Sequence, residues 1–254
     1  FGATASVHNS VVANGCRIDQ GRIQEVKTVN RWLVNFQIVE YFRAFLSGRT
    51  GLSKLNCLLV ISGAFGLFKK APVIEAGGYR SDVVGEDMEL VVRLHRMMRA
   101  GKQPYRISFV PDPVCWTEVP ESLRVLSRQR NRWQRGLAES LYHNFKMMGN
   151  PRFGLVGLLA MPYFLLIECL SPLVEISGYF VFGLGFLRGA VEGWSVAAFF
   201  LLASVLGVLL SLLALFMEEL AFKRYPNVKD LVRLLLAAVL ENFGYRQYLS
   251  LVRA

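Results

Sequence analysis

The chain has 254 residues, of which 53% are hydrophobic, and its formal net charge at pH 7 is +10. The apolar residues are unevenly distributed: the chain is mixed and basic up to Asn150 and almost continuously apolar from Phe153 onward. This distribution, with a mean hydropathy of +0.36, excludes an ordinary soluble globule. It predicts a soluble domain over residues 1–150 followed by a membrane domain over residues 151–254.

The positive charge indicates a lipid bilayer as a partner, because Lys and Arg collect on the cytosolic side of membrane spans and attract anionic lipid. We expect no nucleic-acid partner, since the sequence has no zinc-binding spacing, helix-turn-helix pattern or aromatic RNA-binding motif. The cysteines are far apart and form no C-x-x-C motif, so we expect them to be reduced and buried. They are Cys16, Cys57, Cys115 and Cys169, and the three histidines do not cluster with them.

Alternating strand and helix patterns in the first 150 residues predict an α/β layer. Residues 3–29 have the pattern of short strands broken by turns, and residues 33–48 have helical periodicity that we expect to end at Gly48. The expected elements that follow are an apolar strand over residues 57–70 interrupted at Ser62 and Gly63, a short helix over residues 71–80 closed by Gly77 and Gly78, a helix from Val83 to about Gly101, two extended pieces around Pro111 and Pro113, and a long helix over residues 121–148.

Three apolar blocks follow residue 150. The first, over residues 153–187, is longer than one span needs and is expected to break at its two prolines, Pro162 and Pro172. It predicts an interfacial helix leading into a span, with one tilted helix as the alternative. Residues 194–217 predict a clean span, and residues 231–240 either cross the membrane or lie in the interface.

The loop before the last block is basic, which predicts that this loop and the soluble domain are cytosolic. The expected location is therefore the inner (cytoplasmic) membrane, with several spans. Glu168 and Glu175 lie seven residues apart in the first block, so they share a helix face if no break intervenes. They predict either a polymer channel or hydrogen bonds inside the helix bundle, and the second interpretation is favoured.

The stretch VVGEDMELVVRLHR opens an expected helix with two adjacent carboxylates, Glu86 and Asp87, behind a glycine. A structural interpretation is available, because acidic residues in a first turn complement the helix dipole, and a following Arg makes ordinary surface pairs. A catalytic interpretation is the alternative, since a positioned carboxylate can act as a general base. On this stretch alone the structural interpretation is favoured.

Gln129, Arg132 and Trp133 are spaced at i, i+3 and i+4, which places them on one face of the expected long helix. Taken alone, they fit a basic helix lying on the bilayer surface with Trp133 as an interfacial anchor. They also fit a site in which a guanidinium holds phosphate oxygens and an aromatic ring packs against a sugar. The acid pair upstream and the apolar blocks downstream support the second interpretation, a site that binds phosphate and sugar.

With these motifs the sequence resembles membrane-embedded family 2 glycosyltransferases, the group that includes cellulose, hyaluronan and poly-N-acetylglucosamine synthases. The matching segments are VGED (Val84–Asp87), QRNRW (Gln129–Trp133) as the Q-x-x-R-W motif, and ISGAFGLFKK (Ile61–Lys70) as the acceptor-side strand and turn. The commoner family form has Thr where Gly85 stands here. The resemblance implies the C-terminal, acceptor-side part of a GT-A domain, an α/β fold, followed by transmembrane helices.

The resemblance also implies roles for individual residues. Asp87 would be the base that gives inversion at the anomeric carbon, and Glu86 would orient or support it. Gln129 and Arg132 would bind the donor diphosphate, and Trp133 would pack against the acceptor sugar. Ser62 and Gly63 would let the backbone approach the acceptor, although a plain turn or bulge also explains this pair. Two further arginines of the helix, Arg130 and Arg135, are expected to contact lipid or the surface.

The family's metal-binding D-x-D motif is not found upstream of Asp87. We therefore expect this chain to lack the first half of the catalytic domain and to be inactive alone. Mg²⁺ or Mn²⁺ is expected for the full-length parent, with ligands outside this chain. The expected partners are a nucleotide-sugar donor, which the resemblance implies to be a UDP-sugar, a polysaccharide or lipid-linked acceptor, and the bilayer.

Two other functions compete with a polysaccharide-forming transferase. One is a membrane scaffold without enzymatic activity, and the other is a non-processive enzyme that glycosylates a lipid or a short acceptor. Convergence of Asp87, Arg132 and Trp133 favours an enzyme over a scaffold, and the Q-x-x-R-W motif favours a polymerising enzyme over a non-processive one.

Overall fold

The computed structural model describes residues 10–12, 32–61, 65–110, 119–222 and 227–254. These residues form two compact units, each with its own core. The first unit contains the described parts of Phe1–Gln24, Arg49–Glu118 and Arg132–Cys169, and the second contains those of Glu25–Gly48, Val119–Asn131 and Leu170–Ala254. The division of the chain into a soluble and a membrane domain at residue 150 stays a prediction.

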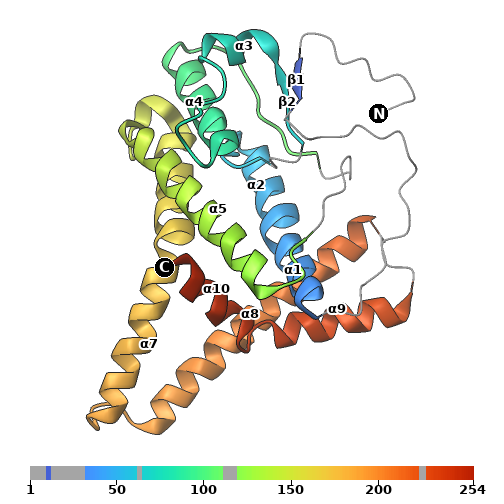
Figure 1. The fold of residues 1–254 in the computed structure, drawn as a ribbon, viewed down its shortest axis with the longest axis vertical. Helices are drawn as coiled ribbons and strands as arrows, with labels where there is room; N and C mark the ends of the chain where they lie inside the picture. The colour runs from blue at the N-terminus through green and yellow to red at the C-terminus, as the bar shows by residue number, and fades with distance from the viewer. Residues whose placement is uncertain (1–9, 13–31, 62–64, 111–118, 223–226) are drawn as a thin grey trace. The chain divides into compact units, whose positions relative to one another are not determined.

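The described residues of the first unit include a pair of short antiparallel strands, β1 (Ser10–Val12) and β2 (Leu67–Lys69), with Val11 opposite Phe68 (Figure 1). The strand expected over the first part of residues 57–70 is wrong for residues 57–61, which the structure describes without helix or strand. Cys57 and Leu59 are fully buried there, so their apolar character reflects a buried connection. The described residues are mostly helical, and the rest of the expected α/β layer stays a proposal.

Helices α3 (Lys70–Glu75) and α4 (Glu86–Ala100) confirm the helix predictions for this region. The two glycines after α3 close it as expected, because Gly77 and Gly78 have φ values of +89° and +72°, where a side chain would be strained. The amide of Gly78 donates to the Val73 carbonyl at 2.8 Å. This turn returns the chain toward the start of α4.

Two hydrophobic clusters hold α4 in the first unit. One side of the helix packs through Met88 and Val92 against apolar residues of Val156–Cys169, and Leu90 and Leu94 pack against Val73 of α3. Each such side chain contributes about 1.5–3 kcal/mol when fully removed from water. The helix that begins with the acid pair is therefore fixed on both sides.

Helix α1 (Trp32–Tyr41) of the second unit continues as the π-helical segment η1 (Phe42–Gly48), and α2 (Arg49–Lys54), which belongs to the first unit, follows directly in the chain. The prediction that this helix ends at Gly48 is wrong. One glycine costs a helix only about 1 kcal/mol relative to alanine, and this one does not have a positive φ. The helical run ends instead before Asn56, whose φ is +51°.

Helix α5 (Leu123–His143) and the 3₁₀ turn η2 (Phe145–Met147) occupy the long helix expected over residues 121–148. The helix crosses from the second unit to the first between Asn131 and Arg132. A second 3₁₀ turn, η3 (Pro151–Phe153), then leads into the apolar part of the chain.

The first apolar block was expected to break at both Pro162 and Pro172, but the described helix breaks at one place only, just before Pro172. The π-helical segments η4 (Val156–Ala160) and η5 (Phe164–Cys169) flank α6 (Met161–Tyr163), so the helical run passes through Pro162. The break comes at Leu170, just before α7 (Ser171–Leu187), where Pro172 occupies the first turn and its missing N–H is not needed. The π-helical segments explain how Pro162 is accommodated, because they change the hydrogen-bond register around it.

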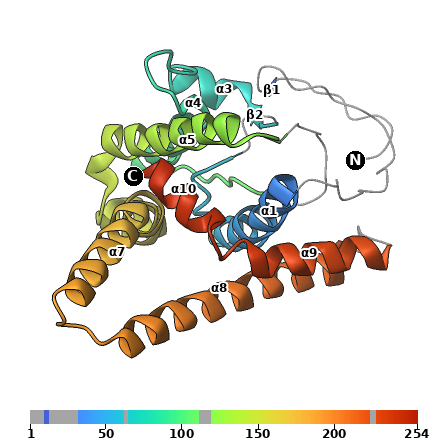
Figure 2. The ribbon, with the colours of Figure 1, turned by 60° about the horizontal axis from the view of Figure 1, so that its bottom comes forward.

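Helix α8 (Gly193–Phe222) contains the span expected over residues 194–217. Within it, Gly193–Ala221 is long and apolar enough to cross a membrane. Among the described residues, Val156–Cys169 and Ser171–Leu187 qualify as a second span only if they are taken together as one broken helix. Helix α9 (Val228–Leu240), which lies alongside α8 (Figure 2), has 13 residues and an apolar face. The sequence did not predict the amphipathic α10 (Tyr245–Arg253) that follows.

Buried charges hold the second unit together, and one of them corrects a prediction. Arg130, expected at the surface or against lipid, is only 5% exposed, and its Nη2 lies 2.9 Å from Glu40 Oε2. The Tyr245 hydroxyl donates to the same Glu40 oxygen at 2.9 Å. Since Arg130 lies between Gln129 and Arg132 in the sequence, this ion pair anchors the part of α5 that carries the motif.

Glu175 lies within the second unit and accepts a hydrogen bond from Ser250 Oγ at 2.5 Å and another from the Tyr179 hydroxyl. This geometry agrees with the interpretation that Glu175 makes hydrogen bonds inside the helix bundle. The break at Leu170 separates Glu175 from Glu168, so the shared helix face expected for the pair is not present.

Candidate active site

The acid pair lies in the first turn of α4, where three carboxylates differ in their surroundings. Glu89 is buried and pairs with Arg93. The distance between Arg93 Nη2 and Glu89 Oε2 is 2.8 Å. The same guanidinium donates to the carbonyls of Ala76 and Gly78, so Glu89 ties the turn after α3 to α4. Glu86 is exposed and Asp87 is half-buried, which leaves these two available for chemistry.

Asp87 has one oxygen occupied by the backbone. Its Oδ1 accepts a hydrogen bond from the Met88 amide at 2.8 Å, while among the described residues no hydrogen bond reaches Oδ2. A half-buried carboxylate with one oxygen held and one oxygen open has the geometry that a general base needs.

Tyr79 lies near the acid pair and was missed by the sequence analysis. Its hydroxyl is buried and has no hydrogen-bond partner within the described part of the chain. Burial, together with the nearby Asp87 and Glu86 carboxylates, raises the pKa of this phenol. Its ring makes an edge contact with Phe68 of β2. A buried hydroxyl without a partner is costly, so its presence beside the acid pair suggests a use in function.

We expect that Tyr79→Phe leaves the stability of the protein unchanged or raises it by about 1 kcal/mol, because it removes a buried hydroxyl that has no partner. Tyr105→Phe is the matched control. The Tyr105 hydroxyl lies 2.5 Å from His95 Nδ1 and accepts from Arg99 Nε at 2.8 Å, so its loss should cost roughly 1–3 kcal/mol. Thermal unfolding in detergent measures both, and an equal loss in the two variants would show that Tyr79 has a partner.

The Q-x-x-R-W residues lie on α5 as their spacing predicted. Arg132 is exposed, and among the described residues it has no ion pair with a carboxylate. Trp133 is 38% exposed. Gln129 is half-buried one turn earlier, in the second unit, and its Oε1 has no hydrogen-bond partner in the described structure. A free guanidinium and a partly exposed indole are suited to a ligand that carries phosphate and sugar.

The acid turn and α5 touch through two glycines of the first unit. A Cβ built on Gly85 would lie 2.9 Å from the Gly136 Cα, and a Cβ built on Gly136 would lie 2.8 Å from the Gly85 Cα. No side chain fits between these two backbones. Gly136 follows Arg132 by four residues and Trp133 by three, so it lies on their side of the helix. The contact brings the start of α4 to the part of α5 that carries Arg132 and Trp133.

Two polar side chains of α5 support this contact. Glu139 Oε2 accepts from the Val84 amide at 2.7 Å, and Glu139 Oε1 accepts from Arg135 Nε at 2.7 Å. The Val84 amide, with Arg135, lowers the pKa of the Glu139 carboxyl. Because a depressed pKa means that folding favours the ionised form, this contact stabilises the unit at neutral pH and is lost as the pH falls through that pKa. Arg135, expected at the surface, lies there.

Ser62 and Gly63, the expected acceptor contacts, lie outside the described residues. Among the described residues no group of three or more His, Cys, Asp or Glu side chains is placed to hold a metal ion. The acid turn of α4 does not fit a metal either, because Glu89 is committed to Arg93 and Asp87 Oδ1 to a backbone amide. No catalytic step can be assigned to a metal on these residues.

The sequence holds a signal for one of the missed residues. Gly136 is an isolated glycine inside a strongly helical pattern, where it costs stability relative to alanine, and a close packing contact is one reason for such a glycine. Tyr79 and Glu139 carry no such signal, since a tyrosine after a turn and a glutamate on a helix are ordinary surface patterns.

Comparison with known proteins gives the family. The family described as "Glycosyl transferase family group 2" matches residues 12–217, a range that includes both the acid pair and the Q-x-x-R-W motif. The chain belongs to this family. The resemblance inferred from the VGED and QRNRW segments is confirmed at this level.

The chain is also similar to curated proteins over part of its length. It is 34% identical over 124 residues to the poly-beta-1,6-N-acetyl-D-glucosamine synthase of Staphylococcus aureus (strain COL), a match that covers 48% of this chain and 29% of that protein. It is 32% identical over 113 residues to the synthase of the same name from Staphylococcus epidermidis, covering 44% of this chain and 26% of that protein. The chain thus spans less than a third of the relatives that it matches. No solved structure matches.

Proposed function

We propose that this chain is the acceptor-side part of an inverting glycosyltransferase that moves a sugar from a nucleotide-diphosphate donor to a growing polysaccharide. The relatives' name indicates N-acetylglucosamine as the sugar and a β-linked polymer as the product. The resemblance to family 2 enzymes favours a UDP-sugar as the donor, with the reaction at the cytosolic face of the inner membrane.

Asp87 acts as the general base in this proposal. Its Oδ2 takes the proton of an acceptor hydroxyl as that oxygen forms a bond to the anomeric carbon of the donor sugar. The bond between the anomeric carbon and the diphosphate oxygen breaks, and the electron pair leaves with the nucleoside diphosphate. Attack opposite the leaving group inverts the anomeric configuration. Glu86, exposed beside Asp87, orients the acceptor or the base.

Arg132 and Gln129 stabilise the leaving diphosphate. A guanidinium offers a planar fork that matches phosphate oxygens, and it stays charged throughout the reaction. The Gln129 side chain, one turn earlier on α5, adds a donor to the same group. Trp133 presents its ring to the acceptor sugar, and Ser62 with Gly63 complete the acceptor side. The divalent ion that the family generally uses would neutralise charge on the diphosphate, with ligands from outside this chain.

The observation that carries this proposal is the contact between Gly85 and Gly136. A scaffold needs no close approach between an acid turn and a basic, aromatic helix face. A transferase does, because the base and the diphosphate-binding groups act on opposite sides of one sugar carbon. The GT-A fold and the membrane domain belong to the same proposal, supported by the family match and by the apolar helix Gly193–Ala221.

The direct test is a transfer assay on membranes that contain the full-length protein, supplied with labelled UDP-N-acetylglucosamine. Label in a polymer that a β-N-acetylhexosaminidase digests supports the proposal. Label in a lipid or a short product would assign the protein to the non-processive class. No transfer from any UDP-sugar, in membranes where the protein is folded, would support the scaffold.

We expect that Trp133→Ala shortens the polymer or weakens acceptor use without weakening nucleotide binding. Stacking of an indole suits the apolar face of a sugar, whereas phosphate is bound by the neighbouring Arg132. Product length and the dissociation constant for uridine diphosphate are measured on the same preparation. Arg132→Gln is the matched variant and should weaken nucleotide binding instead. If Trp133→Ala weakens nucleotide binding and leaves product length unchanged, this division of roles is wrong.

A further inference from the structure

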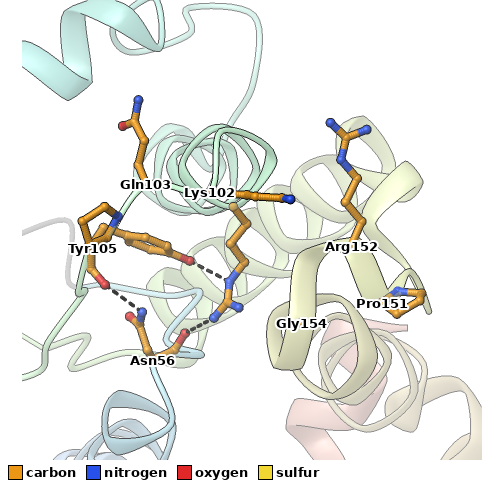
Figure 3. A pocket seen from close by; sticks show the side chains of 9 residues that line it. Asn56, Lys102, Gln103, Tyr105, Pro151, Arg152 and Gly154 are labelled. Carbon is orange, nitrogen blue, oxygen red and sulfur yellow. Dashed lines mark hydrogen bonds between the residues drawn. The ribbon is translucent and has the colours of Figure 1, made fainter.

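A basic pocket of about 390 Å³ lies in the first unit (Figure 3), and neither Glu86 nor Asp87 lines it. Three segments form it: the turn after α2, the end of α4 with the loop that follows, and the 3₁₀ turn η3 that precedes the apolar part of the chain. The residues that line it are Asn56, Arg99, Lys102, Gln103, Pro104, Tyr105, Pro151, Arg152 and Gly154. This lining contains three cations and no carboxylate.

Arg99 is held in place by neutral partners. Its Nε donates to the Tyr105 hydroxyl at 2.8 Å, and its Nη2 donates to the Asn56 carbonyl at 3.3 Å. Its Nη1 lies 2.5 Å from where a Cβ on Gly154 would stand, so this glycine, at φ +53°, leaves room for the guanidinium.

The network behind Arg99 is also fixed. His95 Nε2 donates to the Leu58 carbonyl at 2.9 Å, so Nδ1 accepts from the Tyr105 hydroxyl at 2.5 Å. Burial lowers the pKa of His95 to about 4, which keeps the ring neutral at physiological pH. The guanidinium is therefore preorganised, yet none of its partners neutralises its charge.

Lys102 and Arg152 add exposed positive charge to the lining of the pocket. Both side chains are exposed, and Figure 3 shows Lys102 reaching from the end of α4 toward the turn that carries Arg152 and Gly154. Among the described residues, none of the three cations of the pocket forms an ion pair with a carboxylate. Three unpaired cations around one cavity favour an anion with several oxygens.

An exposed apolar face begins one residue after the pocket. Leu155, Leu158 and Leu159 are 46%, 50% and 47% exposed, and Leu166 and Ile167 continue the face one to two turns later. Water is a poor environment for such a continuous aliphatic surface. A ligand with a phosphate at one end and hydrocarbon at the other matches both the pocket and this face, whereas free phosphate matches the pocket alone.

We propose that this pocket binds the phosphate of an anionic phospholipid, whose acyl chains lie along the leucine face of η4 and η5. The pocket then docks the start of the apolar segment at the headgroup level of the bilayer. This site is separate from the proposed transferase chemistry, because none of its residues belongs to the acid pair or to the Q-x-x-R-W motif.

The test is native mass spectrometry of the delipidated protein in a neutral detergent, titrated with phosphatidylglycerol or with phosphatidylcholine. We expect phosphatidylglycerol to bind at least about ten times more tightly. In the double variant Lys102→Gln with Arg152→Gln, its affinity should fall roughly 25-fold, because each cation near an anionic headgroup contributes a factor of about five. The control Arg124→Gln with Arg128→Gln removes two exposed cations of α5 and should change the affinity less than three-fold.

Three outcomes would overturn the proposal. Equal binding of the two lipids would show that the net negative charge of the headgroup is not recognised. Equal losses in the two double variants would show that only overall charge matters. Displacement of phosphatidylglycerol by micromolar inorganic phosphate would assign the pocket to free phosphate. The single variant Lys102→Gln replaces the double variant if the latter does not fold, with about a five-fold loss expected. Because the readout is lipid binding, failure here would leave the transferase proposal untouched.

Discussion

Replacing Asp87 with asparagine in the full-length protein is expected to lower the rate of sugar transfer by about 10²–10⁴-fold, the range typical for loss of a general base. Asparagine keeps the size of the side chain, and its amide oxygen still accepts from the Met88 amide, as Oδ1 does at 2.8 Å. The helix start should therefore be preserved, and only the ability to take a proton is lost. The measurement is the initial rate of label transfer from UDP-N-acetylglucosamine in membranes.

The matched control is Asp82→Asn, the same chemical change five residues earlier. Asp82 is exposed and pairs with Arg80, and this contact lowers the pKa of its carboxyl to about 2. An exposed ion pair contributes little to folding, so this variant should transfer sugar at nearly the normal rate. Activity of Asp87→Asn within a few-fold of the original protein would remove Asp87 from the role of base.

The helices of this fold were predictable where local signals act alone. Helix α4 has apolar residues at helical spacing and a glycine at its end, and α3 closes on two glycines that adopt positive φ. These are properties of the chain within one or two turns, so the sequence contains them in full. The apolar length of Gly193–Ala221 is likewise a local property.

The failures have tertiary causes. Gly48 was expected to end a helix, yet a single glycine costs a helix only about 1 kcal/mol relative to alanine, and this one does not have a positive φ. Pro162 was expected to break the apolar block, and π-helical segments around it absorb the lost hydrogen bond instead. Arg130 was assigned to the surface because nothing local points to Glu40, which is 90 residues away in the chain.

The candidate site also combines features that local sequence predicts with features that depend on tertiary contacts. The motif residues Asp87, Arg132 and Trp133 could be nominated from their spacing and from the family resemblance. What brings their segments together is the Gly85–Gly136 contact, which joins positions 51 residues apart and involves no side chain. The phenol of Tyr79 near the acid pair is also visible only after folding. The candidate residues could therefore be predicted from the sequence, whereas the contact that brings their segments together is seen only in the structure.

The contact with Gly136 also explains why glycine stands at position 85, where the commoner family form has threonine. A Cβ at this position would stand 2.9 Å from the Gly136 Cα and 3.0 Å from its carbonyl oxygen, closer than non-bonded atoms allow. Both partners are backbone atoms of a packed helix, so no side chain can turn away to make room. In this protein, glycine at position 85 is required by the helix that faces it.

Gly136→Ala is therefore expected to reduce kcat for transfer by about 10²-fold, while the protein stays folded. The added methyl group would lie 2.8 Å from the Gly85 backbone, which forces the acid turn away from α5. A displacement of about 1 Å between reacting groups can cost 10²-fold in rate. In stability, alanine gains about 1 kcal/mol of helix propensity, which offsets part of the roughly 1–3 kcal/mol that overpacking costs.

The matched control is Gly178→Ala in α7, a helix glycine with nothing within 4 Å of an added Cβ. It should raise the stability slightly and leave transfer unchanged. Gly85→Thr should fail as Gly136→Ala does, although it introduces the residue that is commoner in the family. Thermal unfolding and kcat are measured on all three variants. Full activity of Gly85→Thr would show that the two backbones can separate without loss, and that their close approach does not position Asp87.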